Sequence, residues 1–165
     1  MKLLLLLLLL PLGTFAQENV IYKDLKTALI NPELVYHLEL KRKSLHEFPK
    51  QLFLFSNLKT LDLSKNKINF IPDSLAFLSG LHILNLSRNN IELIPNTIDQ
   101  LESLQQLDLW DNYIEVLPIA LTRLPKLKQV DIRGVALSYS KHVAYRELLK
   151  GVDLLMSDPC DCEEK

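Results

Sequence analysis

The chain has 165 residues, 24% of them charged, and a formal net charge of −1 at pH 7. This length suits a single domain. A near-neutral charge without a basic run excludes the electrostatic footprint of a nucleic-acid-binding protein, so we expect no nucleic-acid partner.

The first sixteen residues have the pattern of a secretory signal peptide. Lys2 gives a positive start, residues 3–10 are all leucine, and Thr14 and Ala16 place small residues where a signal peptidase cleaves. The leucine run is shorter than the about 20 apolar residues that a membrane span needs. We predict that residues 1–16 are removed, that the mature chain does not span a membrane, and that it is secreted or lies in the periplasm or cell envelope. An uncleaved anchor is the alternative.

Residues 17–34 are predicted to form a helix that caps the N-terminal end. The apolar residues of this segment have helical spacing; they are Tyr22, Leu25, Ala28 and Leu29. The Asn-Pro pair that follows them ends the helix. A cap is expected because the terminal unit of a repetitive fold exposes one side of its core.

The middle of the chain repeats with a period of 23 residues and no insertion, in three consecutive copies at 58–80, 81–103 and 104–126. A degenerate copy at 35–57 precedes them. A fifth copy begins at 127 and no longer matches the pattern by residue 137. Such a period is typical of a solenoid built from stacked units. The shared pattern is L-x-x-L-x-L-x-x-N-x-I-x-x-I-P-x-x-I-x-x-L.

This pattern resembles that of leucine-rich repeat proteins, and its I-P-x-x-I half is similar to the 23-residue class of Ras-signalling scaffolds and many bacterial repeat proteins. The resemblance implies an α/β fold: a leucine-rich repeat solenoid, or short horseshoe, with a parallel sheet on the concave face and helical caps at both ends. Residues 35–137 would form about five repeats, the first and last degenerate.

The residue types in the pattern agree with this fold. L-x-L alternation predicts a strand with one buried face. Asn66, Asn89 and Asn112 follow the strands, where their amides can satisfy backbone groups of the bend. The proline of each repeat removes a backbone donor on the return path, so that side should not form a second regular sheet.

Residues 138–157 are predicted to form a helical C-terminal cap. Its expected buried stripe consists of Val143, Ala144, Leu148, Leu149, Val152 and Leu155. Residues 158–165 form an acidic tail that contains Cys160 and Cys162. A disulfide between residues i and i+2 is strained, so we interpret the tail as unstructured, with a disulfide between these cysteines or between chains as the alternative.

The outward strand positions supply the candidate binding residues. Four rows of side chains cross the predicted sheet, and Trp110 is the one aromatic residue in a row that is otherwise polar. Exposed tryptophan and tyrosine are enriched at binding hot spots. The candidate site consists of Trp110, Tyr113, Arg88, Asp108, Ile83 and Arg133. The alternatives are a solvated acidic row and a tryptophan ring that packs on the stem of Arg88 or Arg133.

The sequence favours a non-catalytic binding module. No Ser, His and Asp set converges on a pocket, and the four histidines have no ligands at metal-binding spacing, so we expect neither an enzyme, a metal nor a cofactor. We predict an exported monomer that binds a protein or peptide partner on the concave face and adjoining loops. The alternative is a cytoplasmic scaffold or regulator of small-GTPase-type signalling.

Overall fold

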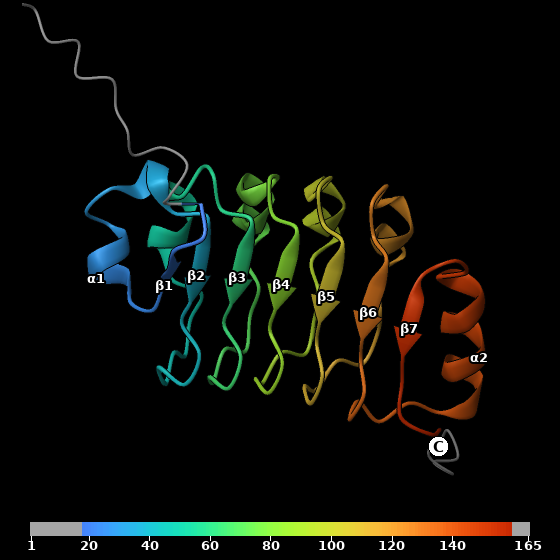
Figure 1. The fold of residues 1–165 in the computed structure, drawn as a ribbon. Coiled ribbons are helices and arrows are strands. Elements are labelled where there is room, and N and C mark those ends of the chain that lie inside the picture. Colours follow the sequence, from blue (N-terminus) through green and yellow to red (C-terminus); the bar gives the residue numbers. More distant parts are fainter. Residues whose placement is uncertain (1–17, 160–165) are drawn as a thin grey trace, which may run out of the picture.

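The computed structural model describes residues 18–159 and shows a single open parallel sheet of seven strands in chain order (Figure 1). The predicted signal peptide and the two cysteines lie outside the described residues. The strands are β1 (Ile21–Tyr22), β2 (His37–Glu39), β3 (Thr60–Asp62), β4 (Ile83–Asn85), β5 (Gln106–Asp108), β6 (Gln129–Asp131) and β7 (Asp153–Leu155). The predicted leucine-rich repeat solenoid is thereby confirmed.

The register of the sheet follows the sequence period. Leu61 on β3 pairs with Leu84, which pairs with Leu107 and then with Val130 on β6. All four are buried, while the residues on either side of each point to the outer face because side chains alternate along a strand. Identical positions of successive repeats therefore form continuous rows.

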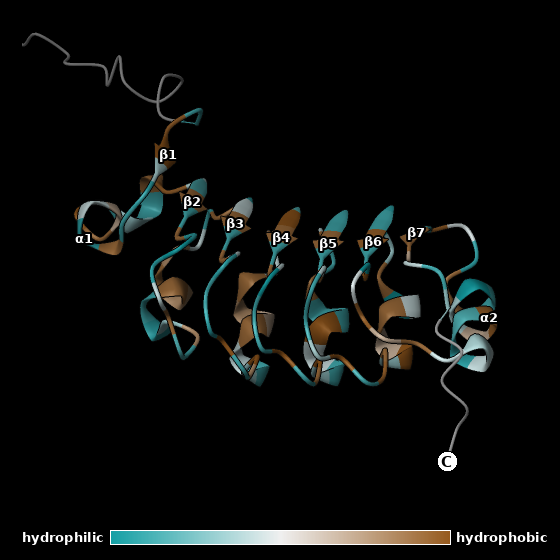
Figure 2. Ribbon diagram, turned by 90° about the horizontal axis from the view of Figure 1, so that it is seen from below, coloured by the Kyte–Doolittle hydropathy of each residue, from teal (hydrophilic) through white to brown (hydrophobic). Residues whose placement is uncertain are grey.

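The return path of each repeat is a short 3-10 helix. These helices are η2 (Lys50–Leu54), η3 (Asp73–Leu78), η4 (Asn96–Gln100) and η5 (Ile119–Arg123), and a shorter one, η1 (Pro32–Leu34), precedes β2. Each of η2 to η5 begins directly after a proline in extended conformation, which fixes φ where the chain turns. The sheet lies along one side of the molecule and these helices along the other (Figure 2).

One cluster of buried side chains, mostly leucine and isoleucine, fills the space between the two layers. Within the described residues, the return side contains one isolated parallel bridge, Leu93 to Val116, rather than a second sheet. This agrees with the expected effect of the repeated prolines.

The N-terminal end differs from the single helix expected over 17–34. It contains the edge strand β1, one turn of helix α1 (Leu25–Ala28), and η1. The side chain of Asp24 accepts a hydrogen bond from the Thr27 N–H at 2.8 Å, which starts the helix only at Leu25. Tyr22 therefore belongs to the sheet rather than to a helix.

The C-terminal end also differs from the predicted helix over 138–157. Helix α2 (Tyr139–Leu148) is followed by β7, which adds a seventh strand to the sheet. Gly151 adopts φ +95°, a conformation that glycine reaches at little cost, and this lets the chain turn from helix to strand.

The predicted buried stripe of α2 was partly wrong. Val143 and Ala144 are exposed, contrary to the prediction, whereas Leu149 is buried as predicted. Tyr145, which the predicted stripe did not include, is also buried. Leu148 and Val152 pack against the core as partly buried residues. The first turns of the helix therefore face inward through Tyr145, which the sequence pattern did not select, rather than through Val143 and Ala144.

Candidate functional site

The candidate site is the outer face of β2 to β6, which we call the concave face. Its first row consists of His37, Thr60, Ile83, Gln106 and Gln129, and its second row of Glu39, Asp62, Asn85, Asp108 and Asp131. In Figure 2, β4 is more hydrophobic than β5 and β6 because it carries Ile83, which is 39% exposed.

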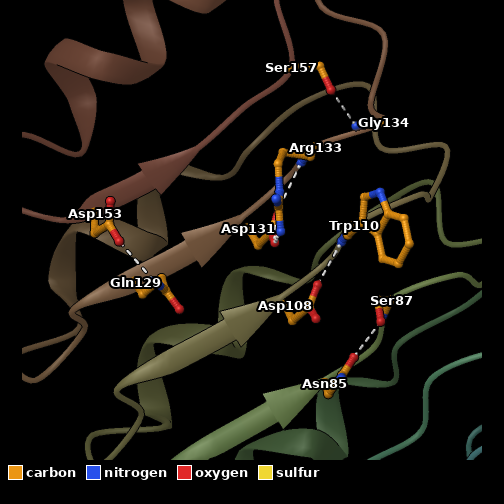
Figure 3. A network of polar contacts seen from close by, with 10 residues as sticks. All are labelled: Asn85, Ser87, Asp108, Trp110, Gln129, Asp131, Arg133, Gly134, Asp153 and Ser157. Carbon is orange, nitrogen blue, oxygen red and sulfur yellow. Dashed lines mark hydrogen bonds and ion pairs between the residues drawn. The ribbon is translucent and has the colours of Figure 1, made fainter.

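Four residues of the second row close the turn at the end of their strands. An oxygen of residues 62, 85, 108 and 131 accepts the backbone N–H two residues further on, at 2.8 to 3.0 Å, as Figure 3 shows for the last three of them. These side chains mimic a backbone turn. The row is therefore not merely a solvated face.

The residue after each turn has left-handed backbone geometry. Lys65, Arg88 and Asp111 have φ of 56–57°, and Gly134 has φ +76°. A left-handed residue after each of β3 to β6 lets the chain leave the sheet.

The asparagine ladder lies below this turn. The Asn89 Nδ2 donates to the carbonyl oxygens of Leu63 at 3.0 Å and Leu86 at 2.9 Å, and its Oδ1 accepts the Ile68 N–H at 3.0 Å. Asn112 repeats these contacts one unit further along. The predicted role of the asparagines is thus borne out in the hydrogen bonds.

Trp110 stands on the concave face beside Asp108 and Arg88. It is 39% exposed, and its backbone N–H donates to Asp108. The Arg88 guanidinium lies 5.4 Å from the centre of the Trp110 ring, within cation–π range. Arg88 also pairs with Asp111 at 3.4 Å. The ring therefore packs on Arg88 and remains partly available to a partner.

The other predicted site residues are divided between two places. Tyr113, 68% exposed, lines an open cavity of about 850 Å³ at the lower ends of the strands, together with Arg88, Asp111 and Lys141. Arg133 forms a bidentate ion pair with Asp131, in which Nη2 lies 2.6 Å from Oδ2. It does not contact Trp110 in any hydrogen bond or ring interaction of the described residues.

Two smaller hollows lie next to one another on the concave face. One, of about 170 Å³, is lined by residues that include Asp108, Gln106 and Gln129. The other, of about 180 Å³, is lined by residues that include Asp62, His37 and Thr60. Ile83 and Asn85 line both. The candidate residues from the sequence omitted Asp62, because the aspartate recurs at this position and looks like part of the repeat.

The carboxylates of the concave face differ in their electrostatic surroundings. Partial burial raises the pKa of Asp108, and the neighbouring Asp131 carboxylate adds to the effect. The Lys41 ammonium lowers the pKa of Glu39 through a hydrogen-bonded ion pair. Asp108 is therefore a carboxylate that its fold disfavours in the charged form.

A second exposed surface was not anticipated from the sequence. Phe70, Leu93 and Val116 occupy the same position of successive repeats on the return path, and they are 62%, 64% and 53% exposed. The signal that could have revealed this surface is the apolar residue directly before the I-P or L-P pair in each of the three regular copies.

The chain belongs to the leucine-rich repeat family. A family model described as "Leucine rich repeat" matches residues 33–91, 57–114 and 79–136, which together cover more than half of the sequence. No curated protein matches the sequence.

Two solved structures show the same fold. A leucine-rich repeat protein of Leptospira interrogans is 29% identical with a TM-score of 0.72, and the match covers 84% of this chain and 35% of that one. An internalin (InlF) of Listeria monocytogenes is 19% identical with a TM-score of 0.59, covering 87% of this chain and 52% of that one. The chain thus spans about a third to a half of the length of these proteins.

Family membership indicates a protein-interaction module, since leucine-rich repeat proteins are generally non-catalytic. Among residues 18–159, no group of three or more His, Cys, Asp or Glu side chains could hold a metal ion. In the same part of the chain, no helix is both long and apolar enough to cross a membrane.

Proposed function

We propose that this protein is an exported monomer that binds a protein or peptide partner through the concave face and the loops below it. The proposal rests on one observation above all: Trp110 and Ile83 expose apolar surface on the concave face, and the exposed Tyr113 lines the open cavity of about 850 Å³ at the loops. Exposed aromatic residues with a polar surround are the usual composition of a binding hot spot.

The size of the concave face supports a footprint that extends onto the loops. The five strands of this face, spaced by about 4.8 Å, span about 19 Å, and strand segments of about 15 Å give about 290 Å². A standard interface buries about 800 Å² per partner. A tight complex therefore needs the loop residues around Tyr113 or one of the caps as well.

Export is supported by the leucine run and the small residues before position 17. The alternative is a cytoplasmic scaffold or regulator of small-GTPase-type signalling, suggested by the resemblance of the repeat to Ras-signalling scaffolds. N-terminal sequencing of the protein from fractionated cells separates these two. A chain that starts at Met1 and remains in the cytoplasm would contradict export.

Affinity capture with Trp110→Ala tests the binding surface. We expect wild-type protein to retain a specific partner that Trp110→Ala recovers at least about fivefold less well, since a hot-spot residue contributes about 1–2 kcal/mol or more. Tyr139→Ala, which removes a 71% exposed aromatic residue from α2, serves as the matched control. Equal recovery by all three proteins would remove Trp110 from the binding surface, provided that all three unfold at the same temperature.

A further inference from the structure

The charges of the second row exceed what the fold requires. Asp62, Asp108 and Asp131 each accept the N–H two residues further on, and Asn85 makes the same contact to Ser87 at 2.9 Å with a neutral amide. An amide oxygen is thus sufficient for the turn. The negative charge at the aspartate positions needs a different explanation.

Two of these carboxylates form no direct ion pair. Glu39 is paired with Lys41, and Asp131 with Arg133. Within residues 18–159, neither Asp62 nor Asp108 takes part in an ion pair. Lys41 attracts Asp62 and Arg133 attracts Asp108 at longer range. The concave face therefore presents two carboxylates without a direct ion pair on β3 and β5, with the neutral Asn85 of β4 between them.

The charge at position 108 also opposes folding. Burial and the nearby Asp131 raise the pKa of Asp108. A carboxyl group whose pKa rises on folding favours the native state at low pH, and this contribution is lost as the pH rises through the folded-state pKa. At neutral pH the ionised group therefore disfavours the fold, which an asparagine at the same position would not do.

The two carboxylates have a spacing that an extended peptide can match. They lie two strands apart, or about 10 Å at about 4.8 Å per strand, and each lines one of the two adjacent hollows. The exposed Ile83 side chain lies between these hollows and lines both. In a polyproline II segment, residues i and i+3 point to the same side about 9.3 Å apart.

We propose that the concave face between Asp62 and Asp108 binds an extended peptide segment with two basic side chains three residues apart, one against each carboxylate, while Ile83 contacts the residues between them. This inference rests on the proposed function and specifies the chemistry of its partner. Charge complementarity identifies the occupant, because each carboxylate lacks a direct ion pair and a basic side chain could pair with it while its contact to Ser64 or Trp110 stays in place.

The probe is an octapeptide with the core Lys-Pro-Pro-Lys, titrated into the ¹⁵N-labelled full chain at low salt. The backbone amides of Ser64 and Trp110 donate to the two carboxylates, so their resonances report directly on each site. We expect both to shift in a saturable way. The same peptide with Glu in place of each Lys should shift neither.

Single substitutions separate charge from structure. Asp62→Asn and Asp108→Asn keep the turn, as Asn85 does, and each should weaken binding of the basic peptide about three- to tenfold. Glu92→Gln, which removes one charge from an exposed residue outside the concave face, should leave the affinity unchanged. Both aspartate variants should unfold at the same denaturant concentration as wild type or higher.

Several outcomes would overturn the inference. They are no saturable shift with the basic peptide, an equal response to the acidic peptide, and unchanged affinity of Asp62→Asn and Asp108→Asn. The proposed function has a separate test, in which Asp108→Asn captures the native partner as well as wild type does and Trp110→Ala does not. This result would support binding through the concave face and would contradict a basic peptide as the partner.

Discussion

The end of the asparagine ladder shows what a single residue contributes to this fold. Asn89 and Asn112 accept the N–H groups of Ile68 and Ile91 at 3.0 and 3.1 Å. The next position of the ladder is Val135, which has no acceptor in its side chain. Accordingly, the Ile114 N–H donates no hydrogen bond among the described residues.

Val135→Asn should therefore be tolerated although Val135 is only 6% exposed. The lost apolar burial of about 1.5 kcal/mol is offset by new hydrogen bonds of about 0.5–1.5 kcal/mol each. We expect the free energy of unfolding to stay within about 1 kcal/mol of wild type in urea denaturation.

Val130→Asn is the matched control for this prediction. Val130 is fully buried on β6, and its side chain faces the leucine core, where an amide finds no ladder. An unpaired buried polar group plus the lost burial should cost about 3 kcal/mol or more. If both variants lose the same stability, the ladder does not extend to position 135.

The sequence predicted the outward position of Trp110 but not the residue on which its ring packs. Its outward position follows from the strand period, and the sequence identified it as an exception in its row. Its contact with Arg88 depends on the left-handed backbone at residue 88. No local preference of arginine predicts that conformation. The sequence therefore could not decide whether the Trp110 ring packs on Arg88 or on Arg133.

The strands of the fold are short, and the C-terminal cap packs on the last of the repeats. Strands β2 to β7 have three residues each, too few to be stable outside the stack. Helix α2 packs over the last repeat through Tyr145, which is 7% exposed. Its hydroxyl accepts the buried Leu117 N–H at 3.0 Å, which ties the cap to the return path of the fourth repeat.

Tyr145→Phe tests this contact. The change keeps the ring in place and leaves the Leu117 N–H without an acceptor, which should lower the free energy of unfolding by about 1–3 kcal/mol. Tyr139→Phe removes the hydroxyl of a 71% exposed residue of the same helix and should change stability by less than about 0.5 kcal/mol. Equal unfolding midpoints for the two variants would show that the hydroxyl contact is unimportant.

The caps were harder to predict than the repeats for a physical reason. Periodicity identifies a buried residue through its copies, and Leu61, Leu84 and Leu107 have such copies. Residues 138–159 have none, so the helical pattern of Val143 and Ala144 had no independent check. The three-residue strand β7 was missed because Asp153, Leu154 and Leu155 fit a helical stripe as well as a strand.

The molecule as a whole behaves as a stack in which each repeat contacts its neighbours. The strand contacts run between successive strands from β1 to β7, and the 3-10 helices contact in the same order. Stability of such a stack is approximately the sum of repeat and interface contributions. The length of the stack can therefore change without loss of the fold, as long as whole units are added or removed.

This modularity leads to a prediction in which the smaller deletion does more harm. Removing residues 81–103 deletes one complete 23-residue unit and brings β3 beside β5 with Leu61 opposite Leu107. It should lower the free energy of unfolding by about 1–3 kcal/mol, at about 0.05–0.15 kcal/mol per residue, and leave a cooperative transition.

Removing only residues 81–92 deletes β4 and Asn89 but leaves Ile94, Ile98 and Leu101 in a segment that has no strand to cover. Because those buried side chains lose their packing, we expect a larger loss of stability than for the full unit. Circular dichroism with urea denaturation measures both, and a half-unit deletion as stable as the whole-unit deletion would contradict the modular stack.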